Sequence, residues 1–552
     1  MLENLETLFK FIGGLGMFLY GMNVMADGLQ KSAGNKMKSL LGYLTNNRLL
    51  AVIVGALITA IIQSSSATTV MVVGFVNAGL MNLVQAVGVI MGANIGTTIT
   101  SWIVSMNEWS AALKPEFFAP FLIGVGAFAI MFTKKEKVKE IGEILVGFGV
   151  LFIGLSFMSG AIKPYAKSPI FANAFTALGG NPILGILTGA VVTAIIQSSS
   201  ASVGILQTLA ANGVVTWNSA VYITLGQNIG TCVTALISSA GANKTAKRAA
   251  VIHLLFNVIG SVIFAGVMFF IFLTNKSFAN ADINSVQISI FHTIFNITCT
   301  VLLYPFANLL VKLSGFFIND EEAKEVAPNE VQQTLQHLDD RILETPSFAV
   351  ESAVKEVIHM GYITLNNAKT SVEALLTKNE QLVKTVVECE SVIDKQTKLI
   401  TEYLIKISNL SLTEKQHFVV NNLFYTVSNI ERVGDHAENL AELAQNRVEH
   451  NVNFTEEGLA ELTEISETAI KAFEASIKAR ETENIEYIRK VVKYEDMVDT
   501  LEEEFREKHI ERLSKNNCNT EAGIIYIDTL VNLERMSDHS LNIAGYVKDE
   551  LE

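Results

Sequence analysis

Long apolar runs, separated by short polar breaks, fill the first 313 residues of this 552-residue chain. Each run approaches the roughly 20 residues that a helix needs to cross a bilayer. Seven membrane-spanning helices are therefore predicted, near residues 8–29, 83–105, 115–133, 141–160, 216–239, 248–273 and 286–312.

Two further apolar stretches are interrupted by the residues QSSS, at 63–66 (the first QSSS segment) and at 197–200 (the second QSSS segment). Ser and Thr favour helix breaks and N-caps, and irregular backbone at membrane depth is tolerated where it lines a cavity. The flanking arms have only about 15 residues each, which is short for a full crossing. Each stretch is therefore predicted to form a re-entrant helical hairpin, with arms at about 48–62 and 66–79, and at about 182–196 and 201–213.

The two QSSS segments belong to an internal duplication. Residues 59–67 and 193–201 both read TAIIQSSSA, and GANIGT at 92–97 returns as GQNIGT at 226–231 with the same spacing of 134 residues. The membrane region is thus predicted to contain two repeats, followed by one extra span. The predicted ranges are about 8–133 for repeat one, about 141–273 for repeat two and 286–312 for the extra span.

Charged residues divide the chain and orient it. Residues 1–313 hold 17 Lys or Arg and 9 Asp or Glu. Residues 314–552 hold 24 Lys or Arg and 46 Asp or Glu. Most basic loop residues of the membrane region fall on the side that also carries the C-terminal region. The positive-inside rule places that side in the cytoplasm and the N-terminus outside. The hairpins then enter from opposite sides, as in the inverted repeats that secondary transporters use to build a site near the membrane midplane.

Duplicated polar clusters in an apolar background favour a substrate or ion site, although serines also help membrane helices to pack closely. The predicted spans contain almost no ionisable side chains, which disfavours proton coupling. Hydroxyl, amide and carbonyl oxygens suit Na+. The hydroxyls and amides, with two helix N-termini worth about +1 in total, also suit an oxyanion, and Na+ would supply the charge still lacking for a dianion. The candidate residues are Gln63, Ser64, Ser65, Ser66, Asn94, Thr97, Gln197, Ser198, Ser199, Ser200, Asn228 and Thr231.

After a polar linker at 314–349, the pattern changes to long charged helices. Two bundles of three helices fit this pattern. Ser411 and Glu414 have the spacing of a capping box, which predicts that the third helix begins there. The helices are predicted near residues 350–378, 380–408, 412–448, 455–481, 483–515 and 519–550.

The C-terminal region is duplicated too, and each copy carries two carboxylate pairs with i, i+4 spacing. Such a pair lies on one helix face, where it can bind a hard metal ion. A solvated charged face with Arg pairs is the alternative, and the two interpretations carry equal weight. The candidate metal ligands are Glu390, Asp394, Glu431, Asp435, Glu495, Asp499, Glu534 and Asp538.

The QSSS and GxNIGT segments resemble those of the sodium-dependent phosphate cotransporter family, including the type II animal cotransporters, over about residues 8–313. The resemblance implies Na+-coupled movement of inorganic phosphate, with both QSSS segments contacting phosphate and Na+. This chain lacks the large loop that the animal members carry between their repeats, and it adds a long C-terminal domain.

The carboxylate motifs resemble those of PhoU, a cytoplasmic regulator of phosphate signalling, over about residues 350–552. That resemblance implies ExxxD motifs that can hold clusters of metal ions. It also implies that the C-terminal domain regulates transport by feedback.

These features predict an all-α polytopic membrane protein of two inverted repeats with re-entrant hairpins, plus a soluble six-helix PhoU-like domain in the cytoplasm. The predicted function is symport of Na+ and inorganic phosphate across the inner membrane. The protein is predicted to be embedded in the lipid of that membrane. Phosphate export, or a membrane-anchored phosphate sensor that transports little, remain alternatives. A homo-oligomer or a phosphate-signalling protein partner is compatible with the sequence. No nucleophile, base or nucleotide motif indicates an enzyme, and the acidic C-terminal half argues against nucleic-acid binding.

Overall fold

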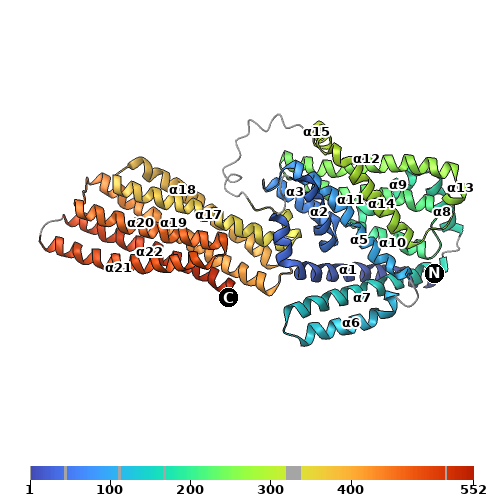
Figure 1. The fold of residues 1–552 in the computed structure, drawn as a ribbon, viewed down its shortest axis with the longest axis horizontal. Coiled ribbons are helices and arrows are strands. Elements are labelled where there is room, and N and C mark those ends of the chain that lie inside the picture. Colours follow the sequence, from blue (N-terminus) through green and yellow to red (C-terminus); the bar gives the residue numbers. More distant parts are fainter. Residues whose placement is uncertain (1, 43–46, 110–113, 166–168, 319–336, 516–518) are drawn as a thin grey trace. The chain divides into compact units, whose positions relative to one another are not determined.

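The computed structural model describes residues 2–42, 47–109, 114–165, 169–318, 337–515 and 519–552, so residues 319–336 of the predicted linker lie outside it. Within these ranges the chain is α-helical, with short 3-10 turns and one isolated bridge between Thr216 and Asp282 (Figure 1). The chain divides into two compact units. The membrane unit comprises Met1–Ala327 and Asp339–Phe348, and the C-terminal unit comprises Pro328–Leu338 and Ala349–Glu552.

Seven helices in the described part of the membrane unit are long and apolar enough to cross a membrane, as predicted. They span Leu5–Ala33, Leu83–Glu108, Pro115–Phe132, Glu136–Tyr165, Trp217–Ser238, Lys244–Thr274 and Ser285–Phe317. The individual elements are α1 (Leu2–Gly42), α2 (Arg48–Ile62), α3 (Ser65–Asn77), α4 (Leu83–Gly96), α5 (Thr98–Ser105), η1 (Met106–Glu108), α6 (Pro115–Phe132), α7 (Glu136–Ile162), η3 (Lys163–Tyr165), α8 (Pro169–Gly180), α9 (Pro182–Ile196), α10 (Ser199–Ala211), α11 (Trp217–Ser238), α12 (Lys244–Thr274), α13 (Lys276–Ala279), α14 (Ser285–Leu303), η4 (Tyr304–Phe306), α15 (Ala307–Phe317) and η6 (Asp340–Glu344).

The first helices of the two repeats, α1 and α7, pack against each other through reciprocal glycine contacts. A Cβ atom on Gly14 would lie 2.8 Å from the Gly154 carbonyl oxygen, and one on Gly21 would lie 2.6 Å from the Gly147 oxygen. Sequence position rises along α1 as it falls along α7, so these equivalent helices run antiparallel. Upstream of the QSSS segments the duplication has a spacing of 133 residues, so Gly14 corresponds to Gly147 and Gly21 to Gly154. The contacts therefore follow a pseudo-two-fold axis, which confirms the predicted inverted repeat.

The hairpin arms α2 and α9 pack closely on α4 and α11, again through glycine. A Cβ on Gly96 would lie 2.5 Å from the Ala56 carbonyl oxygen, and one on Gly230 would lie 2.5 Å from the Ala190 oxygen. Small residues at these positions let the helix backbones approach. The same packing thus holds each hairpin against the helix that carries the GxNIGT segment.

The two repeats differ at one point in the GxNIGT segments. The first-repeat span is interrupted at Thr97, between α4 and α5, whereas α11 continues unbroken through Thr231. The backbone of Thr97 stays in the right-handed helical region (φ −63°, ψ −22°), and its hydroxyl donates to Ser65, whereas that of Thr231 donates to Gln227 of its own helix.

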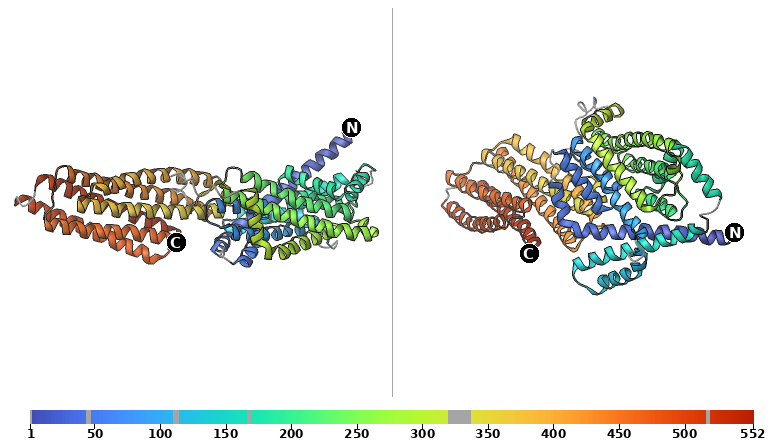
Figure 2. Two further views of the ribbon diagram at one scale, coloured as in Figure 1. Left: turned by 90° about the horizontal axis from the view of Figure 1, so that it is seen from above. Right: turned by 45° about the vertical axis from the view of Figure 1, so that its right-hand side comes forward.

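The C-terminal unit consists of six long helices in its described part, which lie alongside one another (Figure 2). The third of them begins after Thr413, which forms a capping box with Gln416, so the predicted cap at Ser411 is wrong by two residues. α19 packs on α18, α20 packs on α21 and α22, and α19 packs on α22. The helices are α17 (Pro346–Thr377), α18 (Glu380–Ser408), α19 (Glu414–Glu449), α20 (Glu456–Thr482), α21 (Ile485–Ser514) and α22 (Thr520–Leu551).

Candidate functional site

Both QSSS segments begin with a glutamine in the left-handed backbone region. Gln63 has φ 58° and ψ 19°, and Gln197 has φ 55° and ψ 22°. In each case the backbone N–H still donates to the carbonyl of the threonine four residues earlier. A left-handed conformation costs a non-glycine residue about 1–2 kcal/mol. Its recurrence in both repeats marks these turns as features that the fold maintains.

The helices restart directly after each glutamine. Ser64 and Ser198 are N-caps, and their hydroxyl oxygens accept hydrogen bonds from the backbone N–H groups of Ala67 and Ala201 at 3.1 and 3.2 Å. The first-turn N–H groups of α3 and α10 therefore point towards the QSSS segments. Each helix start carries about half a positive charge.

These two helix starts meet. Ser65 Oγ and Ser199 Oγ, on the first residues of α3 and α10, lie 3.4 Å apart. Thr97 Oγ1 donates to Ser65 Oγ, also at 3.4 Å, which brings the first GxNIGT segment to the same place. The arrangement collects hydroxyl groups and the positive ends of two helix dipoles at one point, which suits an anion.

The two glutamines have unequal surroundings although their neighbours in sequence are identical. Gln63 is 3% exposed, and its Oε1 accepts a hydrogen bond from Thr100 Oγ1 at 3.0 Å. Gln197 is exposed and lines a cavity of about 590 Å³. The cavity is lined by Val70, Gln197, Thr234, Ile237, Ser238, Asp339, Asp340, Arg341 and Glu344.

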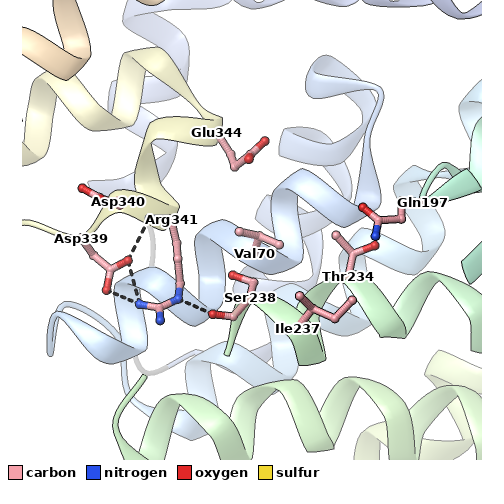
Figure 3. A pocket seen from close by; sticks show the side chains of 9 residues that line it. All are labelled: Val70, Gln197, Thr234, Ile237, Ser238, Asp339, Asp340, Arg341 and Glu344. Atoms are coloured by element: carbon pink, nitrogen blue, oxygen red, sulfur yellow. Dashed lines mark hydrogen bonds and ion pairs between the residues drawn. The ribbon is translucent and has the colours of Figure 1, made fainter. Parts of the chain in front are cut away.

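Figure 3 shows Gln197 and Thr234 at one end of this lining and the Asp339–Arg341 pair at the other. Arg341 Nη1 donates to Asp339 Oδ2 at 2.7 Å, and Arg341 Nε donates to the Ser238 carbonyl oxygen at 2.7 Å. Asp339 also accepts from Asn77 Nδ2 at 2.6 Å. These bonds tie η6 to the C-terminal ends of α3 and α11, so η6 forms one wall of the cavity.

The other candidate residues of the membrane unit occupy less direct positions. Asn94 and Asn228 are buried, and their amide nitrogens donate within their own helices, to the carbonyls of Ile90 and Thr224. Thr231 likewise donates to its own helix at Gln227. Ser66 and Ser200 are buried in the first turns of α3 and α10. Among the described residues, Thr97 is the one GxNIGT side chain that forms a hydrogen bond with a QSSS residue.

Sequence reasoning did not identify Thr100 or Arg341. Thr100 lies one helical turn beyond Thr97, and this spacing is the one feature of the sequence that could have indicated its contact with Gln63. Arg341 stands in a polar linker whose composition gives no sign that it lines a cavity.

In the C-terminal unit the predicted carboxylates gather in two clusters. The first contains Glu390 and Asp394 of α18 with Glu431 and Asp435 of α19. Burial, together with these neighbouring carboxylates, raises the pKa of Glu390 to about 8. Glu390 Oε1 is buried and has no hydrogen-bond partner among the residues that the structure describes, and a Cβ on Gly434 would lie 2.8 Å from both Glu390 carboxylate oxygens.

The second cluster joins Glu495 and Asp499 of α21 to Glu534 and Asp538 of α22. Ligand oxygens of Glu495, Asp499 and Asp538 lie within 4.8 Å of one another. Burial, followed by the neighbouring acids, raises the pKa values of Glu495, Asp499 and Glu534.

Each carboxylate cluster also contacts an arginine. Arg432 Nη1 lies 3.0 Å from Asp435 Oδ2, and Arg535 Nη1 lies 3.7 Å from Asp538 Oδ2. One guanidinium cannot neutralise four or more carboxylates, and the orphaned oxygen of Glu390 also calls for a cation. The oxygen ligands therefore fit a hard divalent metal ion.

Comparison with known proteins gives matches over both units. A family model for the Na+/Pi-cotransporter matches residues 17–160 and 162–294, and a model for the PhoU domain matches residues 357–444 and 462–547. YjbB of Escherichia coli K12, provisionally named an inorganic phosphate export protein, is 23% identical over 548 residues, which cover 99% of this chain and 98% of YjbB.

Two further relatives match parts of the chain. YqeW of Bacillus subtilis is 31% identical over 312 residues, which cover 56% of this chain and 98% of YqeW. Human sodium-dependent phosphate transport protein 2B is 32% identical over 108 residues, which cover 19% of this chain and 16% of that protein.

Proposed function

Because the chain belongs to the Na+/Pi-cotransporter family and carries a PhoU domain, we propose that it moves inorganic phosphate across the inner (plasma) membrane in symport with Na+. The N-terminus lies outside and the C-terminal unit lies in the cytoplasm in this proposal, as the distribution of basic loop residues predicts.

The meeting of Ser65 and Ser199 is the observation that carries this proposal. Phosphate would accept hydrogen bonds from these hydroxyls and from the first-turn N–H groups of α3 and α10. Both helix starts come from equivalent positions of an inverted repeat, so an anion bound by both would lie near the pseudo-two-fold axis. A site at the interface of two inverted repeats can be reached alternately from either side of the membrane.

The charge at this point supports coupling to Na+. Two helix N-termini supply about +1 in total, which is too little for a doubly charged anion. Among the described residues that line the cavity, Arg341 is the one basic side chain, and it is already paired with Asp339. Na+ bound by hydroxyl, amide and carbonyl oxygens of the two QSSS segments would supply the remaining charge.

Export is a second candidate direction. The name of YjbB, which matches nearly the whole chain, supports it. The same site would serve either direction, since the gradients of Na+ and phosphate decide the net flux.

We also propose that the PhoU-like unit regulates flux through η6. The chain enters η6 from His337 and Leu338 of the C-terminal unit and returns to that unit at Ala349. A change at either end would therefore act on the segment that lines the cavity. Divalent metal ions held by the carboxylate clusters would stabilise the PhoU-like unit, because they compensate its concentrated negative charge.

The test is radiolabelled phosphate flux in proteoliposomes, with an inward Na+ gradient, with choline in place of Na+, and with a reversed gradient. The native chain is compared with Gln63→Ala combined with Gln197→Ala. Uptake that requires Na+ and is lost in the double variant supports symport at the QSSS segments.

The remaining outcomes discriminate among the alternatives. Flux that continues undiminished in choline would contradict Na+ coupling. Flux detected only outward, without need of Na+, favours export. Absence of flux from a well-folded protein favours a sensor, and altered gene expression in PhoU-unit variants with unchanged flux would support that role.

A further inference from the structure

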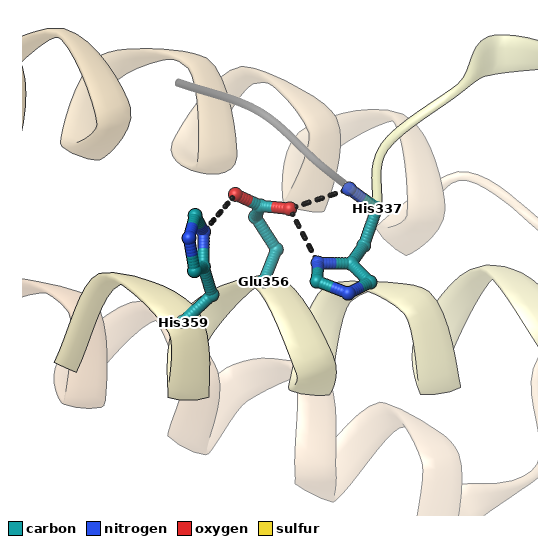
Figure 4. A group of neighbouring side chains, drawn as sticks. All are labelled: His337, Glu356 and His359. Carbon is teal, nitrogen blue, oxygen red and sulfur yellow. Dashed lines mark hydrogen bonds and ion pairs between the residues drawn. The ribbon is translucent and has the colours of Figure 1, made fainter. Parts of the chain in front are cut away.

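Three side chains of the C-terminal unit converge away from both carboxylate clusters. Glu356, on α17, is fully buried, with 0% of its side chain exposed. His337 Nδ1 lies 3.0 Å from Glu356 Oε2, and His359 Nδ1 lies 3.2 Å from Glu356 Oε1. Figure 4 shows the two imidazole rings on either side of the carboxylate.

We propose that His337, Glu356 and His359 bind a divalent transition-metal ion such as Zn2+. Their ligand atoms all lie within 4.8 Å of one another. Two ligand atoms of a tetrahedral zinc ion with bonds of about 2.0 Å stand about 3.3 Å apart. The separations of 3.0 and 3.2 Å involve different oxygens of Glu356, and one ligand atom from each residue lies within 4.8 Å of the others, so rotation of the side chains would bring one carboxylate oxygen and both imidazoles to the same ion.

The local structure holds two of these ligands in place. Glu356 and His359 are three positions apart on α17, and side chains with that spacing lie on the same helix face. Glu-x-x-His is also the spacing by which helical bundles present metal ligands. His337 reaches the carboxylate from outside the helix, and its backbone N–H donates to Glu356 Oε2 at 2.7 Å.

The donor types select the class of ion. Two imidazole nitrogens and one carboxylate suit Zn2+ and similar transition metals, whereas Ca2+ and Mg2+ prefer oxygen ligands. The histidine side chains are 21% and 22% exposed, which leaves the ion a path from solvent and room for a water ligand.

The test uses the full-length protein, purified in detergent and freed of metal with a chelator. Zn2+ affinity and stoichiometry are measured by competition with a chromophoric chelator, for the native chain and for His337→Asn, Glu356→Gln and His359→Asn. All are made in a background with Glu390→Gln and Glu495→Gln, so that the carboxylate clusters contribute less. His417→Asn is the matched control, because His417 is an exposed histidine on α19.

Each of the three substitutions is expected to weaken Zn2+ binding by about 10- to 100-fold, a loss seen even when groups behind metal ligands are removed. The control substitution should leave binding unchanged. Equal affinity and stoichiometry in the native and all three substituted proteins would overturn the proposal.

Co2+ provides a readout that does not depend on the substitutions. Bound at this site in the intact chain, it should show visible d–d absorption typical of mixed imidazole and carboxylate ligation. If a substituted protein loses helicity, the Co2+ spectrum of the intact chain decides whether the site binds metal. A spectrum without imidazole ligation would show that the three side chains form only a hydrogen-bonded cluster.

Discussion

Ser65 and Ser199 stand 134 positions apart in the sequence, yet their hydroxyl oxygens lie 3.4 Å apart. Each is the first residue of a helix that restarts after a left-handed glutamine. Two positive helix ends this close repel each other, and an anion bound beside both hydroxyls would reduce that repulsion. In the proposed function, both halves of the duplication would therefore contribute to one anion site.

Replacing Ser65 or Ser199 by alanine should weaken phosphate binding. A hydrogen bond to a charged group contributes about 1.5–3 kcal/mol, which corresponds to about 10- to 100-fold in the KM for phosphate. The two single substitutions should have similar effects, because the residues are related by the pseudo-two-fold axis. Thr188→Ala on α9 is the control, since its hydroxyl donates to the Leu184 carbonyl of its own helix. An unchanged KM in the double substitution would place phosphate elsewhere.

Replacing Gly55 or Gly189 by alanine should destabilise the membrane unit. The added Cβ would collide with the Val89 or Ile223 carbonyl oxygen, so the hairpin arm must move away from α4 or α11. Overpacking of this kind costs about 1–3 kcal/mol. Thermal unfolding in detergent measures the loss. Gly16→Ala is the control, because no other part of the described structure lies within 4 Å of its added Cβ. If Gly55→Ala and Gly189→Ala unfolded at the same temperature as the native protein, the hairpin arms would be shown to move away from α4 and α11 without loss of stability.

Stability of the PhoU-like unit should fall as pH rises from about 5 to 8 in the presence of a chelator. Folding raises the pKa of Glu390 from 4.5 to about 8, chiefly through burial and then through Asp394 and Asp435. The folded state therefore holds a proton that the unfolded state releases in this range, and the stability that this proton confers is lost as pH approaches 8.

Glu390→Gln should remove that part of the pH dependence. The substituted protein is expected to unfold at a higher temperature than the native one at pH 8 and at a similar temperature at pH 5. Added Mg2+ or Mn2+ should restore the unfolding temperature of the native protein at pH 8, because the bound ion replaces the proton on Glu390. Glu388→Gln, an exposed neighbour on α18, serves as the control. If the unfolding temperatures of the native protein and Glu390→Gln changed in parallel with pH, Glu390 would not be the source of the pH dependence.

Arg341→Ala should raise the rate of phosphate flux and reduce its dependence on the C-terminal unit. The substitution removes the bonds from Arg341 to Asp339 and to the Ser238 carbonyl, so η6 is held less firmly in the cavity wall. Each 1.4 kcal/mol of lost docking free energy changes the fraction of released η6 by about tenfold. Initial rates in proteoliposomes measure the effect, with Arg489→Ala, an exposed arginine on α21, as the control. A rate that falls instead would make Arg341 part of the phosphate path.

Features set by local sequence could be predicted well. The length of each apolar run determines whether it can span a membrane, and the nine-residue identity around the QSSS segments identified the paired breaks. The C-terminal helices begin and end within four residues of their predicted positions. The wrong cap at Ser411 shows the limit of this approach, because Thr413 offers the same chemistry two residues later.

Features that depend on distant packing could not be predicted. GANIGT and GQNIGT differ at Gln227, whose amide donates to the Ser202 carbonyl and hydroxyl oxygens and ties α11 to α10. Neither this contact nor the helix break at Thr97 follows from the short motif. The position of Arg341 depends on how η6 packs on α3, which lies more than 260 residues earlier in the chain.

The unequal burial of Gln63 and Gln197 is informative because the nine residues around them are the same. A difference that the sequence of the segment does not encode must come from its surroundings, which differ between the two repeats. Gln63 is buried, whereas Gln197 is open to a cavity. In the proposed function, exchange of these two environments would give a second arrangement with the site open from the other side, as alternating access requires.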